Sequence, residues 1–285
     1  MSETPGELEV VILGCGSSGG VPRADGNFGV CDPADRRNWR TRCSMLVRRP
    51  RAEGGPVGIG EAGIGEGGET TVVVDASPEF RQQTAAAGAR RLDALLLTHD
   101  HADQSHGLDD IRAFALNQRA RIPCWMDEAT RGTLLRRFGY MFEGEGLYPA
   151  IADQKDIPPH GQPWQVDGPS GPIPVVTFDQ DHGGIRSVGY RFAGVAYSSD
   201  VVDLPDEAFE ALRDLDLWIV DALRYTPHPT HAHVDKALAW IERVKPRRAI
   251  LTNMHIDLDF KELSERLPPG VEPAYDGMTV RTPLR

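Results

Sequence analysis

One short apolar run that ends in a patch of metal-ligand side chains constrains the fold more than any other part of the chain. Residues 95–97 are all leucine, and the patch after them holds His99, His101 and Asp103. Such a run is typical of a buried strand, and the residues after Gly107 favour a helix. The patch is therefore predicted to be a tight strand-to-helix loop. Imidazole and carboxylate groups that converge in such a loop suit zinc, manganese or ferrous iron.

Composition narrows the class of protein. The chain has 285 residues, of which 40% are hydrophobic, and this is ample for a core. Its net charge of −11 argues against nucleic acid as the main partner. The four cysteines are widely spaced, which fits a reduced, cytosolic protein. The chain shows neither a secretory signal nor a membrane-spanning run, so we expect a cytoplasmic protein that does not contact a membrane.

Polar side chains follow several other predicted strands. Asp75, Asp200 and Asp221 each come at the end of a buried apolar run, and His182 follows the strand predicted near residues 173–178. Ligands at different strand ends can converge from distant parts of the chain. Asp75 is either a ligand itself or a carboxylate that accepts an N–H from a ligand histidine or from loop backbone. We favour the second role.

A glycine-rich loop follows the first predicted strand, residues 8–13. Gly14, Gly16 and Gly19 satisfy the Gly-x-Gly-x-x-Gly pattern of dinucleotide sites. That pattern needs a helix directly after it, whereas only turn-forming residues follow here. We therefore favour a loop that passes close to the site or the substrate.

Four further segments carry predictions. The arginine-rich segment 32–42 either meets an anionic substrate or, more commonly for such clusters, forms a solvated face. Segment 53–69 consists largely of Gly and Glu, which predicts a flexible insertion. Segment 139–172 is predicted to be irregular and to form a lid or substrate wall. Residues 271–280 are predicted to form a strand pair. The aromatic residues of segment 139–172 are candidates for pocket lining or for plain packing: Tyr140, Phe142, Tyr148 and Trp164.

Taken together, these motifs make the chain resemble the metallo-β-lactamase superfamily. In chain order they are Asp75 after a strand, Thr-His-x-His-x-Asp at 98–103, His182, Ser-Asp at 199–200 and Leu-Thr-x-x-His at 251–255. Ordered motifs over so much of the chain are far more specific than any one of them. Within the superfamily, the glycine-rich loop and the His-Pro-Thr-His at 228–231 are similar to the phosphoribosyl cyclic phosphodiesterases of phosphonate breakdown. The tRNA 3′-processing nucleases and the coenzyme-PQQ accessory proteins are more distant relatives.

The resemblance implies a fold and a ligand set. The fold would be α/β, a four-layer αββα sandwich with two mixed sheets and external helices, forming a single domain over residues 1–285. One or two divalent ions per chain are expected, zinc or manganese, with iron as an alternative. Two sets of residues would hold them. The first metal would be bound by His99, His101 and His182, with Asp200 bridging to a second metal held by Asp103 and His255.

The chain departs from the family pattern at the second metal. Gln104 and Asn253 stand where the family usually has histidine. An amide oxygen is a weaker ligand than imidazole, so the second site is looser, prefers a harder ion such as manganese, or depends on His255. The related phosphodiesterases also carry a cysteine-rich structural zinc. Only Cys31 remains in that region, so we predict no such zinc here.

The resemblance further implies a metal-dependent hydrolase, with a small phosphodiester, including cyclic ones, as the expected substrate. Metal-bound hydroxide would attack phosphorus in line with the leaving group. His231 is expected to protonate the leaving alkoxide, with His233 as the next candidate. Either histidine could instead cap the helix that begins at Val234. Asp103 is counted as catalytic as well as a ligand.

Three alternatives remain open on the same residues. The first is hydrolysis of a lactone, thioester or β-lactam, since fold does not fix substrate. The second is a nuclease that acts on RNA 3′ ends. The net negative charge of the chain argues against this alternative. The third is a non-enzymatic metal-binding accessory protein. The expected partner is a small anionic molecule, and a homodimer is one option for assembly.

Overall fold

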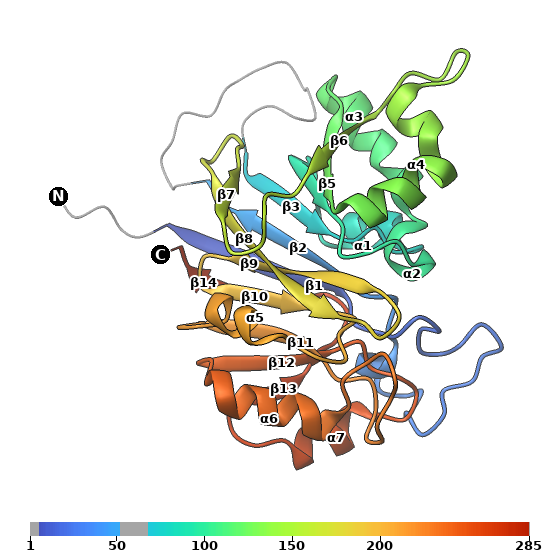
Figure 1. Cartoon of the computed structure of the whole chain (residues 1–285). Helices are drawn as coiled ribbons and strands as arrows, with labels where there is room; N and C mark the ends of the chain where they lie inside the picture. The colour runs from blue at the N-terminus through green and yellow to red at the C-terminus, as the bar shows by residue number, and fades with distance from the viewer. Residues whose placement is uncertain (1–5, 52–67, 285) are drawn as a thin grey trace.

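The computed structural model describes residues 6–51 and 68–284. Nearly all of the insertion predicted at 53–69 therefore lies outside the described residues. The rest of the chain forms two seven-stranded sheets that face each other, with helices on their outer sides (Figure 1). This is the predicted four-layer αββα sandwich, and that prediction is confirmed.

The first sheet has the strand order β14-β1-β2-β3-β4-β5-β6. Pairing is antiparallel from β14 to β3 and parallel from β3 to β6, so the sheet is mixed. The strands are β1 (Glu7–Gly14), β2 (Ser44–Arg49), β3 (Thr70–Val74), β4 (Ala94–Leu96), β5 (Ile122–Met126), β6 (Ala152–Asp156) and β14 (Met278–Pro283).

The second sheet has the order β13-β12-β11-β10-β9-β8-β7. Here pairing is parallel from β13 to β10 and antiparallel from β10 to β7, which mirrors the first sheet. The strands are β7 (Pro163–Val166), β8 (Ile173–Asp181), β9 (Arg186–Phe192), β10 (Val195–Ser198), β11 (Leu217–Asp221), β12 (Arg248–Thr252) and β13 (Val271–Pro273).

Helices cover the outer face of each sheet. The first sheet carries α1 (Phe80–Ala86), η2 (Leu108–Ile111), α3 (Arg112–Gln118) and α4 (Glu128–Glu143). The second carries α5 (Asp206–Ala211), α6 (Val234–Val244) and α7 (Phe260–Arg266). Two short turns, η1 (Arg36–Asn38) and α2 (Ala102–Ser105), lie in loops. No helix among the described residues is long and apolar enough to span a bilayer.

The side chains of strand β1 point alternately into two cores, and this explains how the layers pack against each other. Val10 and Ile12 point between the sheets, into one core with residues of the second sheet. Val11 and Leu13 point the other way, into a separate core under the helices. Because successive side chains of a strand point to opposite faces, a strand covered on both sides must be apolar at nearly every position. This is the pattern of residues 8–13.

Segment 139–172 is more regular than the sequence predicts. This segment holds the end of α4 and the strands β6 and β7, which form the outer edges of the two sheets. Its aromatic residues do not line the cavity of the candidate site described below. Phe142 is buried under the helices, and Trp164 packs at a tilt against Trp125, with ring centroids 4.3 Å apart. Tyr140 and Tyr148 both donate to Asp109 at 3.0 Å.

Two strands with a turn at Asp276 between them are present in the segment predicted as a strand pair at 271–280, but the pairing of these strands with each other is wrong. β13 pairs with β12 in the second sheet, whereas β14 pairs with β1 in the first. The turn at Asp276 therefore carries the chain across the sandwich. Its buried carboxylate accepts the backbone N–H of Cys15 at 3.1 Å and that of Thr41 at 2.7 Å. This turn ties the glycine-rich loop to the sandwich.

Arg40 belongs to the arginine-rich segment but is buried, with 2% of its surface exposed. Its guanidinium donates to the carbonyl of Leu258 at 2.7 Å, to Asn38 Oδ1 at 3.1 Å and to the carbonyl of His255 at 3.3 Å. The segment is therefore not simply a solvated face. Arg40 fastens it to the loop after β12, close to Cys31. The predicted absence of a structural zinc stays a prediction.

Candidate metal centre

The strand ends of both sheets meet at one edge of the sandwich, as the sequence pattern predicts. Three residues at this edge adopt the left-handed backbone conformation. Each of them lies one or two positions after the end of a strand. They are Asp75, Asp200 and Asn253, with φ of 64°, 56° and 61°. Asp and Asn are the non-glycine residues that most readily adopt this conformation. Each turns the chain sharply and leaves a polar side chain at the edge.

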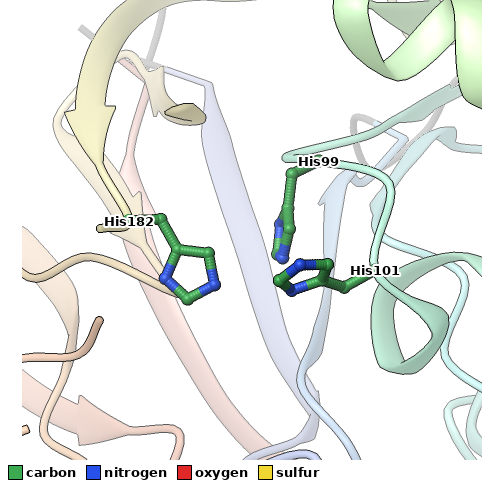
Figure 2. Close-up of side chains that lie close together, drawn as sticks. All are labelled: His99, His101 and His182. Carbon is green, nitrogen blue, oxygen red and sulfur yellow. The ribbon is translucent and has the colours of Figure 1, made fainter. Parts of the chain in front are cut away.

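Three histidines converge at this edge (Figure 2). One nitrogen of each of His99, His101 and His182 lies within 4.8 Å of the others. Their ring centroids are 4.5, 5.0 and 5.2 Å apart. His99 and His182 are buried, whereas His101 is exposed. The cluster therefore opens to solvent on the side of His101.

Hydrogen bonds orient two of these rings. The Nδ1 of His182 lies 2.7 Å from the carbonyl oxygen of Thr230, so Nδ1–H donates and Nε2 is left for a ligand. The Nδ1 of His99 lies 2.9 Å from Thr98 Oγ1, and its buried Nε2 has no partner. Burial lowers the pKa of His99 to about 3, which keeps the ring neutral. A neutral ring with a free Nε2 and a bonded Nδ1 is the form that binds a metal.

Asp75 supports the position of His99 through hydrogen bonds to Thr98. Its carboxylate, fully buried, accepts the backbone N–H of Thr98 at 2.8 Å and the Thr98 hydroxyl at 2.9 Å. Because that hydroxyl donates to Asp75, its oxygen is free to accept Nδ1–H of His99. Asp75 thus accepts an N–H from the loop backbone, which is the supporting role favoured from the sequence.

A second group of donors shares His182 with the first. One donor atom of each of His182, Asp200 and His231 lies within 4.8 Å of the others. The Nδ1 of His231 is 2.9 Å from Asp221 Oδ2 and 3.9 Å from Asp200 Oδ1. Burial lowers the pKa of His231, but the nearby carboxylates of Asp221, Asp200 and Asp103 outweigh burial and raise it to about 9.

Asp221 is a site residue to which the sequence assigned no role. It is fully buried at the end of β11 and accepts the backbone N–H of Val201 at 3.0 Å as well as Nδ1–H of His231. The available signal was its position, since Asp75 and Asp200 also follow buried strands. Position alone gives no partner, because the partner, His231, lies ten residues further on in the loop between β11 and α6.

Gln104 and Asn253 both lie against the carboxylate of Asp200. Gln104 is fully buried, and its Nε2 donates to Asp103 Oδ2 at 3.1 Å and to Asp200 Oδ2 at 3.2 Å. Asn253 Nδ2 is 3.4 Å from Asp200 Oδ1. The two positions at which the chain departs from the family pattern therefore meet in space. Both present amide N–H groups to the carboxylate predicted to bridge two metals.

Two predicted site residues are not brought into the centre. The structure does not bring His255 into either group of donor atoms, because both of its ring nitrogens have other partners, and its role as a ligand of the second metal stays a prediction. Its Nδ1 is 2.9 Å from Asp257 Oδ2, and its Nε2 contacts the guanidinium of Arg23. His233 directly precedes α6, and its ring makes no hydrogen bond or ion pair with the described residues. Its position fits the alternative of a residue at the helix start.

A cavity of about 360 Å³ opens over the centre. Ser18 of the glycine-rich loop is part of its wall, so the prediction that this loop passes close to the site is confirmed. Among the described residues, no helix directly follows this loop, so the glycine pattern lacks the helix that a dinucleotide site needs. The lining consists of Ser18, His101, Asp103, His182, Gly184, Ile185, Asp200, Thr230 and His231.

Comparisons with known proteins agree with this geometry. The family model described as "Beta-lactamase superfamily domain" matches residues 70–256. A solved diphosphatase of the PhnP family is 29% identical, with 98% of each chain covered and a TM-score of 0.79. Zn²⁺-bound PqqB from Methylobacterium extorquens is 17% identical, with 95% of this chain and 99% of that chain covered and a TM-score of 0.70. At 17% identity, the similarity to PqqB shows the fold alone.

One curated relative is longer than this chain. An octanoyltransferase of Porphyromonas gingivalis (strain ATCC BAA-308 / W83) is 30% identical over 277 residues, which is 95% of this chain and 51% of the relative. The chain thus spans about half of that protein.

The three clustered histidines suit a divalent metal ion. On this fold and with this donor set, the protein belongs to the metallo-β-lactamase superfamily, in the branch of the PhnP family.

Proposed function

We propose that the protein is a phosphodiesterase that hydrolyses a small phosphodiester, cyclic or linear, to a phosphomonoester and an alcohol. One observation carries the proposal. His231 is held through Nδ1 by the buried carboxylate of Asp221, and it lines the same cavity as His101 and His182. A proton donor beside a metal-ligand cluster is what cleavage of an ester with a poor leaving group requires.

Each residue of the site has its own role in the proposed hydrolysis. A divalent ion held by His99, His101 and His182 would activate water and neutralise charge on the phosphate. As the water oxygen bonds to phosphorus and the P–O bond to the leaving group breaks, Nε2–H of His231 gives its proton to the departing oxygen. Asp221 holds the other nitrogen and stabilises the imidazolium before transfer. A water proton is released to solvent, and His231 takes up a new one.

The size and charge of the site support a small substrate. The cavity measures about 360 Å³, which is within the range of small-molecule sites. The net charge of −11 disfavours RNA, which usually requires a basic surface. The PhnP-family relative is itself a diphosphatase, so phosphoryl chemistry occurs on a related chain.

The test is a pair of chromogenic substrates. The purified protein, supplied in turn with zinc, manganese and ferrous iron, is assayed on bis-p-nitrophenyl phosphate and on nitrocefin. We expect release of p-nitrophenolate and no opening of the β-lactam ring. Hydrolysis of nitrocefin without cleavage of the phosphodiester would overturn the proposal. So would inactivity on phosphodiesters with each of the three metals.

We further propose that one ion per chain binds tightly, because two amides stand where a second ion would need stronger ligands. Changing Gln104 and Asn253 together to histidine is expected to raise the metal content from about one to about two ions per chain, since imidazole is the better ligand. Elemental analysis after gel filtration measures this content. Gln165→His, at an exposed position of strand β7, is the matched control, and its metal content should stay at the wild-type value.

Two results would contradict the proposal of a single tight ion. One is a wild-type protein that already retains two ions after gel filtration. The other is a folded double variant that still holds only one. Because both results concern metal content, they do not depend on which substrate the protein hydrolyses.

A further inference from the structure

The three clustered histidines differ in how their rings are held. The Nδ1 atoms of His99 and His182 lie 2.9 and 2.7 Å from oxygen acceptors. The ring of His101 is exposed and makes no hydrogen bond with a described residue. Metal-binding histidines usually have such a partner at the second ring nitrogen, and this partner fixes the orientation of the ring. The direction of the His101 ring therefore depends on how firmly its own backbone is held.

Hydrogen bonds hold the backbone carbonyls on both sides of the His101 α-carbon. The carbonyl of Asp100, in the peptide unit before His101, accepts Nη1–H of Arg137 at 2.6 Å. The carbonyl of His101 accepts the hydroxyl of Ser105 at 2.7 Å and the backbone N–H of Gln104 at 3.2 Å. The two peptide units that set the direction of the His101 side chain are thus both fixed.

Arg137 differs from the other donors because it comes from outside the loop. Ser105 and Gln104 belong to α2, which directly follows His101, whereas Arg137 lies on α4. Among the described residues, Arg137 is the only one outside 98–106 that hydrogen-bonds to the backbone of residues 99–103. A bond from a guanidinium to a carbonyl is charge-assisted and stronger than a neutral one. Arg137 therefore anchors the ligand loop to the helical layer.

The position of Arg137 on α4 suits this role. Leu134 and Met141 are fully buried in the core under the helices. Arg137 lies three residues after the first and four before the second, so it belongs to the same side of the helix. Arginine is uncommon on such a side unless its guanidinium is paired. Here the guanidinium reaches past the apolar residues and binds the carbonyl of Asp100.

Arg137 acts on the loop through the backbone. It does not line the cavity over the centre, so it is not placed to contact a substrate there. Its Nη2 lies 3.7 Å from Asp100 Oδ2, and both side chains are partly exposed, so this ion pair contributes little. The shorter bond reaches a main-chain oxygen, and the position of that peptide unit directly affects the next residue, His101.

We propose that Arg137 is a positioning residue for the metal centre. By holding the carbonyl of Asp100, it keeps the ring of His101 directed toward His99 and His182, and this tightens the binding of a divalent ion. Removal of a group that supports a metal ligand weakens metal binding by roughly 10- to 100-fold. The proposal concerns metal binding and goes beyond the hydrolysis proposed above.

Arg137→Met tests the proposal, because methionine is unbranched but has no hydrogen-bond donor. The Kd of the full chain for zinc is measured by competition with a chromogenic chelator. We expect this Kd to rise roughly 10-fold in Arg137→Met. Loss of a positive charge would by itself favour a bound cation, so charge does not explain such a rise. Arg137→Lys keeps a charged donor and should raise the Kd only about threefold.

Arg136→Met is the matched control. Arg136 is the neighbouring residue of the same helix, is exposed, and among the described residues donates only to the hydroxyl of Thr133, at 3.1 Å. Its loss should leave the Kd for zinc within about twofold of the wild-type value. After removal of the metal, the wild type and both methionine variants should melt within about 4 °C of one another.

Three outcomes would overturn the proposal. The first is an unchanged Kd for zinc in Arg137→Met. The second is an equal rise in Arg136→Met, which would show a general effect on α4. The third is an Arg137→Met protein that fails to fold, or melts well below the wild type, together with wild-type zinc affinity in Arg137→Lys. Arg137 would then serve stability alone. These measurements need no substrate, so they remain decisive if the proposed phosphodiesterase activity is absent.

Discussion

Replacing His182 by alanine is expected to remove the bound divalent ion and to lower kcat/KM by more than about 10⁴-fold. His182 is the one side chain shared by both groups of donor atoms, and its ring is fixed by the carbonyl of Thr230. Without it, the first group keeps only His99 and His101, which come from a single loop. Metal content after dialysis and turnover of bis-p-nitrophenyl phosphate measure the two effects.

His106→Ala is the matched control for this prediction. His106 belongs to the same histidine-rich stretch, but it is exposed and its ring packs against Phe138 at a centroid distance of 5.8 Å. It belongs to neither donor group. Its loss should leave metal content and turnover near the wild-type values. A His182→Ala protein that keeps both its metal and its activity would show that the three-histidine cluster is not the metal site.

The three clustered histidines were predictable because their signals are local. His99 and His101 follow an apolar run, and His182 follows the buried strand β8. Residues at the ends of buried strands must lie at a sheet edge, and in a sandwich of two sheets these edges come together. Predicting these positions requires only the strand assignments and no knowledge of side-chain orientation.

The position of His255 outside the donor groups has a physical cause that the sequence does not reveal. Asn253 turns the backbone into the left-handed conformation, and the next residue, Met254, is then fully buried. The following side chain is turned outward, so the ring of His255 meets Arg23. The number of residues after a strand therefore does not predict which side chain points into the site. That direction depends on backbone angles and on which neighbour is buried.

The errors in the fold arose where pairing is decided by distant contacts. β6 has the sequence Ala-Asp-Gln-Lys-Asp, which lacks the apolar alternation of a strand because it lies at the edge of its sheet. The turn at Asp276 resembles a hairpin turn, yet β13 and β14 join different sheets. Local turn signals indicate that the chain reverses direction. They do not indicate which strand it pairs with afterwards.

Replacing His231 by alanine is expected to lower hydrolysis of 2′,3′-cyclic AMP by roughly 100- to 1000-fold. The leaving group there is a ribose hydroxyl, which is a poor leaving group unless it is protonated. The same variant should lose less than about tenfold on bis-p-nitrophenyl phosphate, because p-nitrophenolate departs without a proton. Asp221→Asn should show the same pattern more weakly, since it leaves the ring in place and removes the carboxylate that holds Nδ1.

Metal content decides how such a result is interpreted. His231 lies within 4.8 Å of donor atoms of His182 and Asp200, so it is also placed where a ligand could be. A proton donor leaves metal content unchanged when it is removed and affects the two substrates unequally. A ligand takes metal with it and affects both substrates alike. Because the Nδ1 of His231 already binds Asp221, we expect the first result, and loss of metal from His231→Ala would refute its assignment as the proton donor.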